Sequence, residues 1–365
     1  MTAGDAGSWP EVLQHLAARR DLPRPLAFWA MGEILVGRAS DAQIAAFVIG
    51  LRVKGESVAE VRALADAMIE AGLQVELPDS VRPVLDVVGT GGDHAHTVNI
   101  STMAALVAVG CGSRVVKHGN RAATSATGTA DVLEALGLTL EASPAEVARQ
   151  LDDVGIAFCF APVFHPAMRH AAAVRRELGI PTVFNILGPL TNPAGAEAAL
   201  IGCADESRAP LMAEVLAERG VSALVVRGDD GLDEVSVSAP TSVWLAHHGA
   251  VRRLSLDAEA LGIPRYERSV LVGGDRHRNA DLLRKALGLT DAGDDAAAVT
   301  AIRDVVAVNA AAALVAWEVA LGSPVPADDA ALSDAVSVRL GDARAALLDG
   351  RAADVLERWC APRPA

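Results

Sequence analysis

Cysteine is scarce in this chain, and its copies lie far apart. The chain has four, with neither a C-x-x-C pair nor the dense spacing of a disulfide framework: Cys111, Cys159, Cys203 and Cys360. We therefore expect reduced thiols in a cytoplasmic protein, most of them acting as small core residues.

Positive charge and long apolar runs are also lacking. Acidic residues number 46 against 32 Lys and Arg, and the net charge of −14 disfavours nucleic acid and anionic membranes as partners. Residues 1–10 contain no basic segment followed by an apolar one, and no run reaches the roughly 18 apolar residues of a membrane span. The longest candidate, residues 305–317, includes Asn309 and is predicted to be a buried helix.

The composition is that of a folded protein. Hydrophobic residues make up 51% of the 365 residues and charged residues 21%, the opposite of a disordered composition. At roughly 100 to 200 residues per domain, this length allows two domains or one large α/β unit with an appendage.

The first part of the chain is predicted to be helical throughout. Ser-x-x-Gln at residues 40–43 and Ser-x-x-Glu at residues 57–60 are capping boxes, and each precedes apolar residues spaced by three and four. Residues 9–72 therefore form a helical module, followed by a predicted linker at residues 75–83.

Beyond the linker, short apolar runs alternate with helical stretches. This alternation predicts a mostly parallel sheet with helices on its faces, and hence an α/β fold. The predicted strands are residues 84–88, 114–116, 156–160, 223–226 and 243–245. The predicted helices include residues 100–109, 130–136, 144–154 and 165–178, and residues 291–298 are predicted to form a flexible loop.

The sequence Gly-Thr-Gly-Gly-Asp at residues 89–93 follows the first predicted strand. Open α/β sheets bind ligands at the carboxyl ends of strands, and glycines let backbone N–H groups approach an anion, so this loop favours a phosphate. It is not a dinucleotide fingerprint, because His94 replaces the third glycine, and the chain has no Gly-Lys pair for a Walker motif. Taken alone, the loop is equally consistent with a tight turn.

Two further segments add groups that suit an anion. Asn-Ile-Ser-Thr at residues 99–102 places hydroxyl and N–H groups at the positive end of a predicted helix, although an ordinary N-cap is the plainer interpretation. Lys-His-Gly-Asn-Arg at residues 117–121 follows the next strand and holds one of only three lysines. With the hydroxyls of Thr124 and Ser125, it suits a phosphate and a small planar acid; a solvated basic turn is the alternative.

A cluster of carboxylates, Gly-Asp-Asp-Gly-Leu-Asp-Glu at residues 228–234, follows the strand predicted at residues 223–226. Carboxylate oxygens at a strand end suit hard ions such as Mg²⁺, which are often shared with a substrate phosphate. An acidic loop without metal is the commoner case in general. The two phosphate-favouring loops make a metal site the preferred interpretation here.

These segments, in this order and spacing, resemble the anthranilate phosphoribosyltransferase family. The likeness extends through His-Pro-Ala-Met at 165–168, Val-Arg-Arg-Glu-Leu-Gly at 174–179, Phe-Asn-Ile-Leu-Gly-Pro-Leu-Thr-Asn-Pro at 184–193, Gly-Gly-Asp at 273–275 and Asn-Ala at 279–280. It covers nearly the whole chain, about residues 12–358.

The resemblance implies transfer of the phosphoribosyl group of PRPP to the amine of anthranilate, with release of pyrophosphate, in tryptophan biosynthesis. It implies Mg²⁺ as cofactor, PRPP and anthranilate as small-molecule partners, and a homodimer formed through the helical part. The implied fold is nucleoside phosphorylase/phosphoribosyltransferase-like, with a small helical domain, residues 1–78, hinged to an α/β domain, residues 79–365. Helices from about residues 165–200 would join the helical domain in space.

By position, the family's site residues fall on this chain as follows. The PRPP contacts are Gly89, Gly92, Asp93, Thr97, Asn99, Ser101, Thr102, Lys117, Thr124 and Ser125. The Mg²⁺ ligands are Ser101, Asp233 and Glu234, and the anthranilate contacts are Gly89, Asn120, His165, Arg175 and Gly188. Lys117, Asn120 and Arg175 are assigned to catalysis. Lys117 and the metal would stabilise the leaving pyrophosphate, and Arg175 would hold the anthranilate carboxylate.

Three alternatives stay open at this stage. A nucleoside phosphorylase of the same architecture would transfer a ribosyl group to phosphate, although the Asp233-Glu234 pair favours PRPP with Mg²⁺. A different aryl amine could replace anthranilate as acceptor. A non-catalytic relative could bind nucleic acid, against which the net charge of −14 argues. In addition, His94 stands where the family has glycine, and with His96 it leaves a histidine-based metal site as a minor hypothesis.

Overall fold

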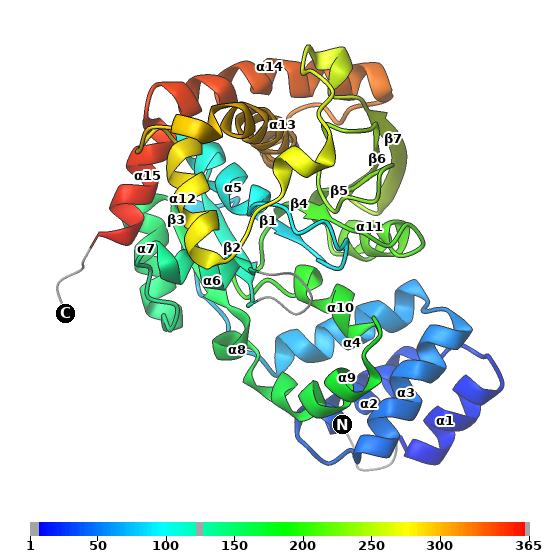
Figure 1. Ribbon diagram of the computed structural model, residues 1–365. Coiled ribbons are helices and arrows are strands. Elements are labelled where there is room, and N and C mark those ends of the chain that lie inside the picture. Colours follow the sequence, from blue (N-terminus) through cyan, green and yellow to red (C-terminus); the bar gives the residue numbers. More distant parts are fainter. Residues whose placement is uncertain (1–6, 122–126, 362–365) are drawn as a thin grey trace.

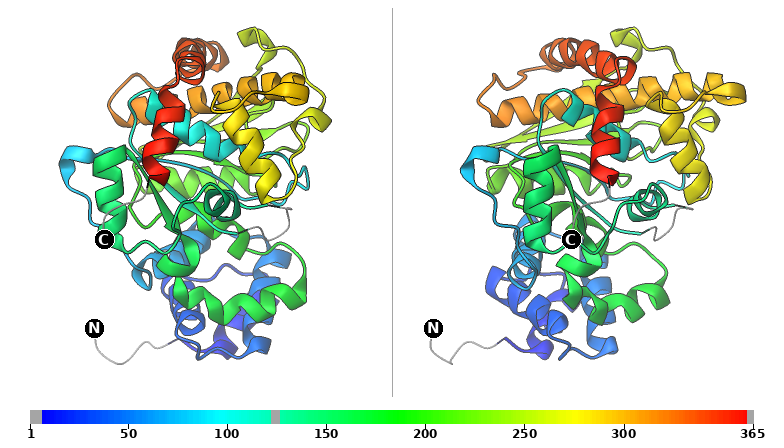
Figure 2. Two further views of the ribbon diagram at one scale, coloured as in Figure 1. Left: turned by 60° about the vertical axis from the view of Figure 1, so that its left-hand side comes forward. Right: turned by 90° about the vertical axis from the view of Figure 1, so that its left-hand side faces the viewer.

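The computed structural model describes residues 7–121 and 127–361 (Figure 1). A module of helices lies beside a larger domain built around one β-sheet, and Figure 2 shows the same arrangement from two further sides. This architecture confirms the predicted α/β fold with a smaller helical part.

The N-terminal module consists of consecutive helices. They are α1 (Trp9–Ala17), α2 (Arg24–Leu35), α3 (Asp41–Lys54) and α4 (Val58–Glu70). Two of them, α3 and α4, begin at the capping boxes predicted from the sequence. Both capping boxes form: the Ser40 and Gln43 side chains each accept a hydrogen bond from the other's backbone N–H, at 3.3 and 2.9 Å, and Ser57 and Glu60 do the same at α4. These bonds partner N–H groups that the first turn of a helix leaves free.

Within the described residues the strands form one seven-stranded sheet, in the order β3-β2-β1-β4-β5-β6-β7. The strands are β1 (Leu85–Gly89), β2 (Val115–Gly119), β3 (Ile156–Phe160), β4 (Ala198–Gly202), β5 (Ser222–Gly228), β6 (Thr241–His247) and β7 (Ala250–Leu256). Strands β1 to β5 run parallel, and β6 and β7 add an antiparallel edge. This confirms a mostly parallel sheet.

Two strands were not predicted from the sequence. β4 begins with two alanines and carries only one β-branched residue, so its apolar run resembles a helix as much as a strand. β7 contains two arginines and exposes most of its residues, as expected at a sheet edge, so it lacks a clear apolar pattern.

Helices cover both faces of the sheet. After the first strand they are α5 (Ile100–Gly110), α6 (Thr129–Ala135), α7 (Pro144–Val154), α8 (Ala161–Phe164), α9 (Ala172–Leu178), α10 (Phe184–Leu187), α11 (Ala209–Glu218), α12 (Arg276–Ala286), α13 (Ala296–Ala320), α14 (Asp329–Leu348) and α15 (Arg351–Cys360). The 3₁₀ turns are η1 (Asp79–Val81), η2 (Pro166–Ala171), η3 (Gly188–Leu190), η4 (Glu259–Leu261), η5 (Arg268–Leu271) and η6 (Gly293–Asp295). Leu224 and Val226 of β5 pack with α5 and α13, whereas Ala223 and Val225 pack with α11, as the alternation of a strand requires.

Two predicted elements differ from the structure. Residues 165–178 are not one α-helix, because η2 precedes α9 and His165 lies outside both with φ −123° and ψ 58°. A residue that precedes proline, as His165 does, is disfavoured in the α conformation. Residues 291–298 are not a loop throughout, since they contain η6 and the start of α13.

Helix α13 is the central helix of the α/β core, as predicted for residues 305–317. Its residues 305–316 are buried on all sides, which suits a helix that is apolar all round. Within the described chain, one segment, Gly293–Ala320, has the length and hydropathy of a membrane span, and 78% of its apolar window is buried inside the structure.

Segments from the middle of the chain complete the helical module. η2 packs on α2, α9 on α3 and α10 on α4, and Figures 1 and 2 show these segments beside the N-terminal helices. Val174 and Phe184 share one buried cluster with Met31 and Leu64. This packing places α9 and α10 next to the loops of the sheet, and the boundary predicted at residue 78 stays a prediction.

Candidate active site

The carboxyl ends of the central parallel strands meet at one edge of the sheet, where the loops that follow them form the candidate site. β1 pairs with β4 so that Gly89 lies opposite Gly202. The loop after β5 crosses this edge so closely that a Cβ on Gly202 would lie 1.6 Å from the Asp233 carbonyl oxygen, and a Cβ on Gly89 would lie 2.5 Å from Asp233 Oδ2. Only glycine fits at Gly202, where the obstruction is backbone, and a Cβ on Gly89 would displace the Asp233 carboxylate.

The glycine-rich loop turns back on this acidic loop. Gly91 and Gly92 have φ values of 65° and 86°, a region that favours glycine. The Gly91 N–H donates to Asp233 Oδ2 at 2.8 Å, so two segments predicted separately are directly bonded. The loop ends at Thr97, which forms an antiparallel bridge with Val272.

Three carboxylates crowd this edge. Burial, and then repulsion from Asp93 and Glu234, raise the pKa of Asp233 well above its usual value. Burial raises the pKa of Glu234 to about 8, although the Lys117 ammonium and the Ser101 N–H act in the opposite direction. Asp93 Oδ2 is buried and has no hydrogen-bond partner in the described chain. A divalent cation would relieve this repulsion and bond the unpartnered oxygen, so the residues fit Mg²⁺.

The protein alone does not enclose a metal ion. Among residues 7–121 and 127–361, no group of three or more His, Cys, Asp or Glu side chains is placed to hold one. The histidine-based site considered for His94 and His96 therefore finds no ligand set in that part of the chain, and both histidines are exposed. Mg²⁺ at Asp233 and Glu234 would need further oxygens from substrate phosphates and water.

Lys117 is a buried cation between the acidic loop and α5. It is 1% exposed, and its Nζ donates to the carbonyl oxygens of Val87 and, at 3.5 Å, Ser101. Burial lowers the pKa of Lys117 to about 8, while Asp86 and Glu234 favour its charged form. Lys117 is therefore a residue of β2 itself and not of the loop predicted to follow the strand, and its ammonium lies against β1 and the start of α5, near Glu234.

The start of α5 adds polar groups at the positive end of a helix. Asn99 is the N-cap residue, but its side chain does not cap the helix; Asn99 Oδ1 accepts instead from Asn279 Nδ2 at 3.0 Å. The interpretation of Asn99 as an ordinary cap is thus wrong. Thr102 is fully buried, and its Oγ1 has no hydrogen-bond partner among the described residues.

Not all of the side chains predicted to form a ligand site after β2 lie together in the structure. Arg121 pairs with Asp131 at 2.9 Å and Glu134 at 3.0 Å on α6, so its charge is already balanced there and Lys117 is the cation of this segment that lies near the carboxylates of the candidate site. Asn120 is exposed, and its Oδ1 accepts from the Arg121 N–H. Thr124 and Ser125 lie outside the described residues.

Two buried histidines link β2 to the helical module. The His118 and His165 rings lie 5.1 Å apart between centroids, and His118 Nδ1 donates to the Gly188 carbonyl at 2.9 Å. His165 Nε2 donates to the Thr191 carbonyl at 3.0 Å. Burial, with His165 adding to it, lowers the pKa of His118 to about 3, and burial lowers that of His165 too. His165 and Gly188, two of the residues predicted to contact anthranilate, thus both contact His118.

Arg175 is the basic group that the helical module brings toward this region. It lies in α9, half-buried, with its guanidinium carbon 5.9 Å from the centre of the Phe184 ring. Burial lowers its pKa, and no carboxylate in the described chain pairs with it. Phe184 opens α10, which leads directly into Gly188. A partly desolvated cation without a counter-ion is suited to an anionic ligand.

Comparisons with known proteins match this chain along most of its length. A family model described as glycosyl transferase family, a/b domain, matches residues 81–324, and one described as glycosyl transferase family, helical bundle domain, matches residues 10–72. An anthranilate phosphoribosyltransferase from Salinispora arenicola is 52% identical over 353 residues, which cover 96% of each chain.

Solved structures agree in fold. The crystal structure of an anthranilate phosphoribosyltransferase from Thermus thermophilus superposes with a TM-score of 0.84 at 38% identity, covering 96% of this chain and 98% of that one. The Saccharomyces cerevisiae enzyme in complex with PRPP and Mg superposes with a TM-score of 0.82 at 28% identity, covering 96% of each.

The chain belongs to the anthranilate phosphoribosyltransferase family. This membership confirms the predicted enzyme class, a pentosyl-transferring glycosyltransferase of tryptophan biosynthesis, together with its substrates and its use of Mg²⁺.

Sequence reasoning missed buried polar residues that support the candidate site. Asp86 accepts from the His118 N–H at 3.1 Å and from Asn192 Nδ2 at 2.7 Å, and burial raises its pKa to about 6. Asn309 of α13 bonds the backbone of Val235. A signal existed in both cases, because each is a lone polar residue within an apolar run.

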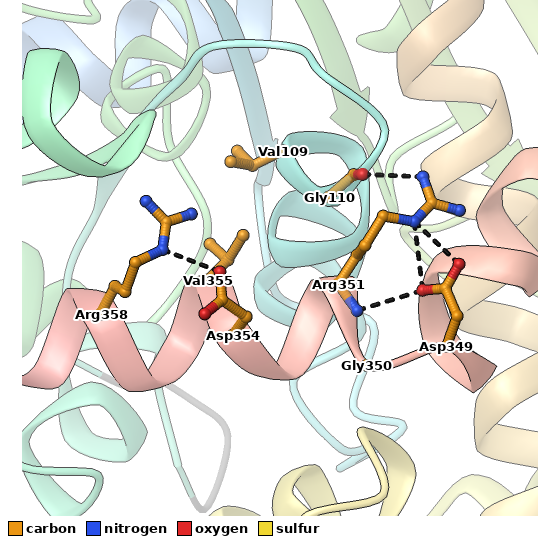
Figure 3. Close-up of a pocket in the computed structure, with 8 residues that line it drawn as sticks. All are labelled: Val109, Gly110, Asp349, Gly350, Arg351, Asp354, Val355 and Arg358. Carbon is orange, nitrogen blue, oxygen red and sulfur yellow. Dashed lines mark hydrogen bonds and ion pairs between the residues drawn. The ribbon is translucent and has the colours of Figure 1, made fainter.

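A hollow on the surface lies away from the candidate site (Figure 3). It encloses about 340 Å³ between the end of α5 and the start of α15. Its arginines already have partners, since Arg351 pairs with Asp349 at 2.9 Å and Arg358 with Asp354 at 2.8 Å. It contains none of the predicted site residues.

Proposed function

We propose that the loops at the carboxyl edge of the sheet bind PRPP, and that α9 and α10 supply the acceptor site, in transferring the phosphoribosyl group to the amine of anthranilate. The observation that carries this assignment is the meeting of the glycine loop, Lys117 and three carboxylates at one edge. A phosphorylase would need the phosphate-binding groups but not a carboxylate cluster that calls for a divalent cation.

In the proposed PRPP site, charged groups and hydrogen-bond donors act on different parts of the substrate. Breaking the bond from the anomeric carbon to pyrophosphate builds positive charge on the ribose and negative charge on the leaving group. Lys117 would stabilise the leaving group, and the loop N–H groups with Asn99, Ser101 and Thr102 would hold the phosphates and ribose. Mg²⁺, held by Ser101, Asp233 and Glu234, supplies further positive charge to the pyrophosphate when bound.

The acceptor site depends on position more than on proton transfer. The amine of anthranilate is already a nucleophile, so holding its carboxylate at Arg175 would aim it at the sugar. His118 and His165 each keep a buried ring nitrogen without a hydrogen-bond partner in the described chain, at Nε2 and Nδ1. His118 Nε2 can accept a hydrogen bond beside Gly188, where we place the aromatic ring, whereas His165 Nδ1 faces Gly72.

The test is the loss of anthranilate fluorescence when PRPP and Mg²⁺ are added to the purified protein. Turnover that EDTA abolishes and excess Mg²⁺ restores is the expected result. Phosphate with a nucleoside, in place of PRPP and anthranilate, tests for a phosphorylase. Turnover of a substituted anthranilate alone would instead identify a different aryl amine as the acceptor.

We further propose that the chain forms a cytoplasmic homodimer through the helical module, whose boundary we place at residue 78. Exposed apolar side chains support such an interface, since Val36 and Val53 are 56% and 63% exposed. Light scattering of the purified protein tests this, and a monomer mass would refute it.

A further inference from the structure

The segment that carries Gly273, Gly274 and Asn279 has no part in the binding roles described above, yet it reaches the PRPP site through one side chain. Asn279 lies in the first turn of α12 and is 3% exposed. Resting on the proposed binding of PRPP by Asn99, we propose that Asn279 is a positioning residue that fixes the orientation of the Asn99 amide, so that Asn99 offers hydrogen-bond donors to PRPP.

Asn99 is held in an arrangement that is unusual for an N-cap. An asparagine at this position ordinarily accepts a hydrogen bond from an N–H of the first helical turn. Asn99 makes no such bond, and its Oδ1 accepts from Asn279 Nδ2 at 3.0 Å. The side chain is therefore withdrawn from the helix and fixed by a residue 180 positions later in the chain.

The direction of this bond is set by a backbone group. The Gly274 N–H donates to Asn279 Oδ1 at 2.7 Å, and an N–H can only donate. Asn279 Oδ1 therefore accepts from Gly274, and Asn279 Nδ2 donates to Asn99. The atom of Asn99 that faces Asn279 must then be its oxygen, Oδ1. Neither amide can turn over without placing two donors or two acceptors against each other.

The two hydrogen bonds that connect Gly274 to Asn279 and Asn279 to Asn99 form a relay, and the surrounding backbone holds it in place. The Gly273 N–H donates to the His96 carbonyl at 2.9 Å, which ties the Gly273-Gly274 turn to the glycine-rich loop. A Cβ on Gly273 would lie 2.3 Å from Asn279 Oδ1, so only glycine lets Asn279 approach. The side chain of Thr127 also donates to the Gly274 carbonyl, at 2.8 Å.

One consequence concerns the other end of the Asn99 amide. With Oδ1 engaged, Nδ2 faces away from Asn279, and no group in residues 7–121 and 127–361 accepts a hydrogen bond from it. Asn99 is half-buried at the start of α5, where the helix dipole favours anions. The relay thus presents an N–H donor, not an oxygen, to a ligand that is rich in phosphate oxygens.

The test replaces the side-chain nitrogen of Asn279 by an oxygen, which reverses the direction of its hydrogen bond with Asn99. In Asn279→Asp, one carboxylate oxygen still accepts from Gly274, while the other faces Asn99 and makes its amide turn over. Asn99 then presents oxygen to PRPP, so the Kd for PRPP at saturating Mg²⁺, measured by calorimetry, should rise roughly 10-fold or more. The KM for anthranilate should stay within about twofold, because α12 packs chiefly on α6 and α13 rather than on the helices of the acceptor site.

A double-mutant cycle with Asn99→Ala separates this role from a general effect of charge or folding. If Asn279 acts through Asn99, Asn279→Asp adds little further loss of PRPP affinity once Asn99 is alanine. If Asn279→Asp fails to fold by circular dichroism, Asn279→Ala replaces it. That variant frees the Asn99 amide without inverting it, so its loss should be smaller and again absent in the Asn99→Ala background.

Equal losses in both backgrounds would overturn the inference, as would unchanged PRPP affinity in the single variant. The unmodified protein separates this result from a failure of the proposed function. If it binds PRPP but does not consume anthranilate, only the acceptor assignment fails, and the cycle still decides the role of Asn279. If it does not bind PRPP at all, both proposals are refuted.

Discussion

Asn309 and Val235 form a pair of hydrogen bonds that joins the central helix to the acidic loop. The Val235 N–H donates to Asn309 Oδ1 at 2.9 Å, and Asn309 Nδ2 donates to the Val235 carbonyl at 2.9 Å. Asn309 is fully buried in α13, and Val235 directly follows Glu234. One side chain thereby satisfies both backbone groups of the residue next to a proposed metal ligand.

Asn309→Ala should be strongly destabilising for this reason. The substitution leaves the N–H and the carbonyl of Val235 buried without partners, and each such group costs about 1–3 kcal/mol. We expect the free energy of unfolding, measured in urea, to fall by roughly 2–5 kcal/mol. The matched control is Thr300→Ala, which removes an exposed hydroxyl from the same helix and should change stability by less than about 0.5 kcal/mol. Equal effects of the two substitutions would show that the Asn309 bonds contribute nothing.

The buried histidine pair makes a contribution to stability that is lost in acid. The pKa of His118 falls from 6.5 to about 3 on folding, so between these pH values the unfolded chain binds more protons than the native one. This group therefore lowers the free energy of unfolding as the pH drops below 6.5, by up to about 1.4 kcal/mol per pH unit, whereas the raised pKa values of Asp86 and Glu234 act in the opposite direction. The pKa of His165 shifts in the same direction as that of His118 and adds to its slope.

Urea titrations at pH 6.5, 6.0, 5.5 and 5.0 isolate this contribution. His118→Gln removes the titrating ring, so relative to the parent protein the variant should gain stability as the pH falls from 6.5 to 5.0. His277→Gln is the control, since that histidine is exposed and should leave the slope of the parent protein unchanged. Parallel slopes for the parent protein and His118→Gln would contradict the prediction.

Asp233→Asn should separate metal binding from stability. Burial, and then repulsion from Asp93 and Glu234, disfavour the charged form of Asp233, so its neutral replacement should raise the Tm in the absence of Mg²⁺. The same change removes a charged ligand, so the Mg²⁺ concentration for half-maximal turnover should rise on the order of 10-fold. Asp229→Asn alters an exposed carboxylate of the same loop and is the matched control. An unchanged Mg²⁺ midpoint in Asp233→Asn would remove Asp233 from the metal site.

The sequence was most informative where chemistry depends on the backbone. The glycine loop, the start of α5 and the acidic loop could be placed together because parallel strands end at one edge of a sheet. Side-chain partners could not be predicted in this way. Arg121 looked like a phosphate ligand beside Lys117 but pairs with α6, and that choice depends on where a separate helix packs. The relay from Asn279 to Asn99 likewise joins segments whose proximity only the fold creates.

Arg175→Ala should weaken anthranilate binding selectively. The guanidinium of Arg175 is half-buried, lies over the Phe184 ring and has no carboxylate partner in the described chain, so an anionic ligand is the group that would offset its desolvation. A hydrogen-bonded pair with a carboxylate is worth about 1.5–3 kcal/mol, which predicts a rise of roughly 10-fold or more in the KM for anthranilate and less than about twofold in that for PRPP. Arg176→Ala removes the neighbouring, exposed arginine of the same helix and should change neither constant. If only the PRPP constant rises in Arg175→Ala, this guanidinium belongs to the donor site, and the anthranilate carboxylate must be held by another group.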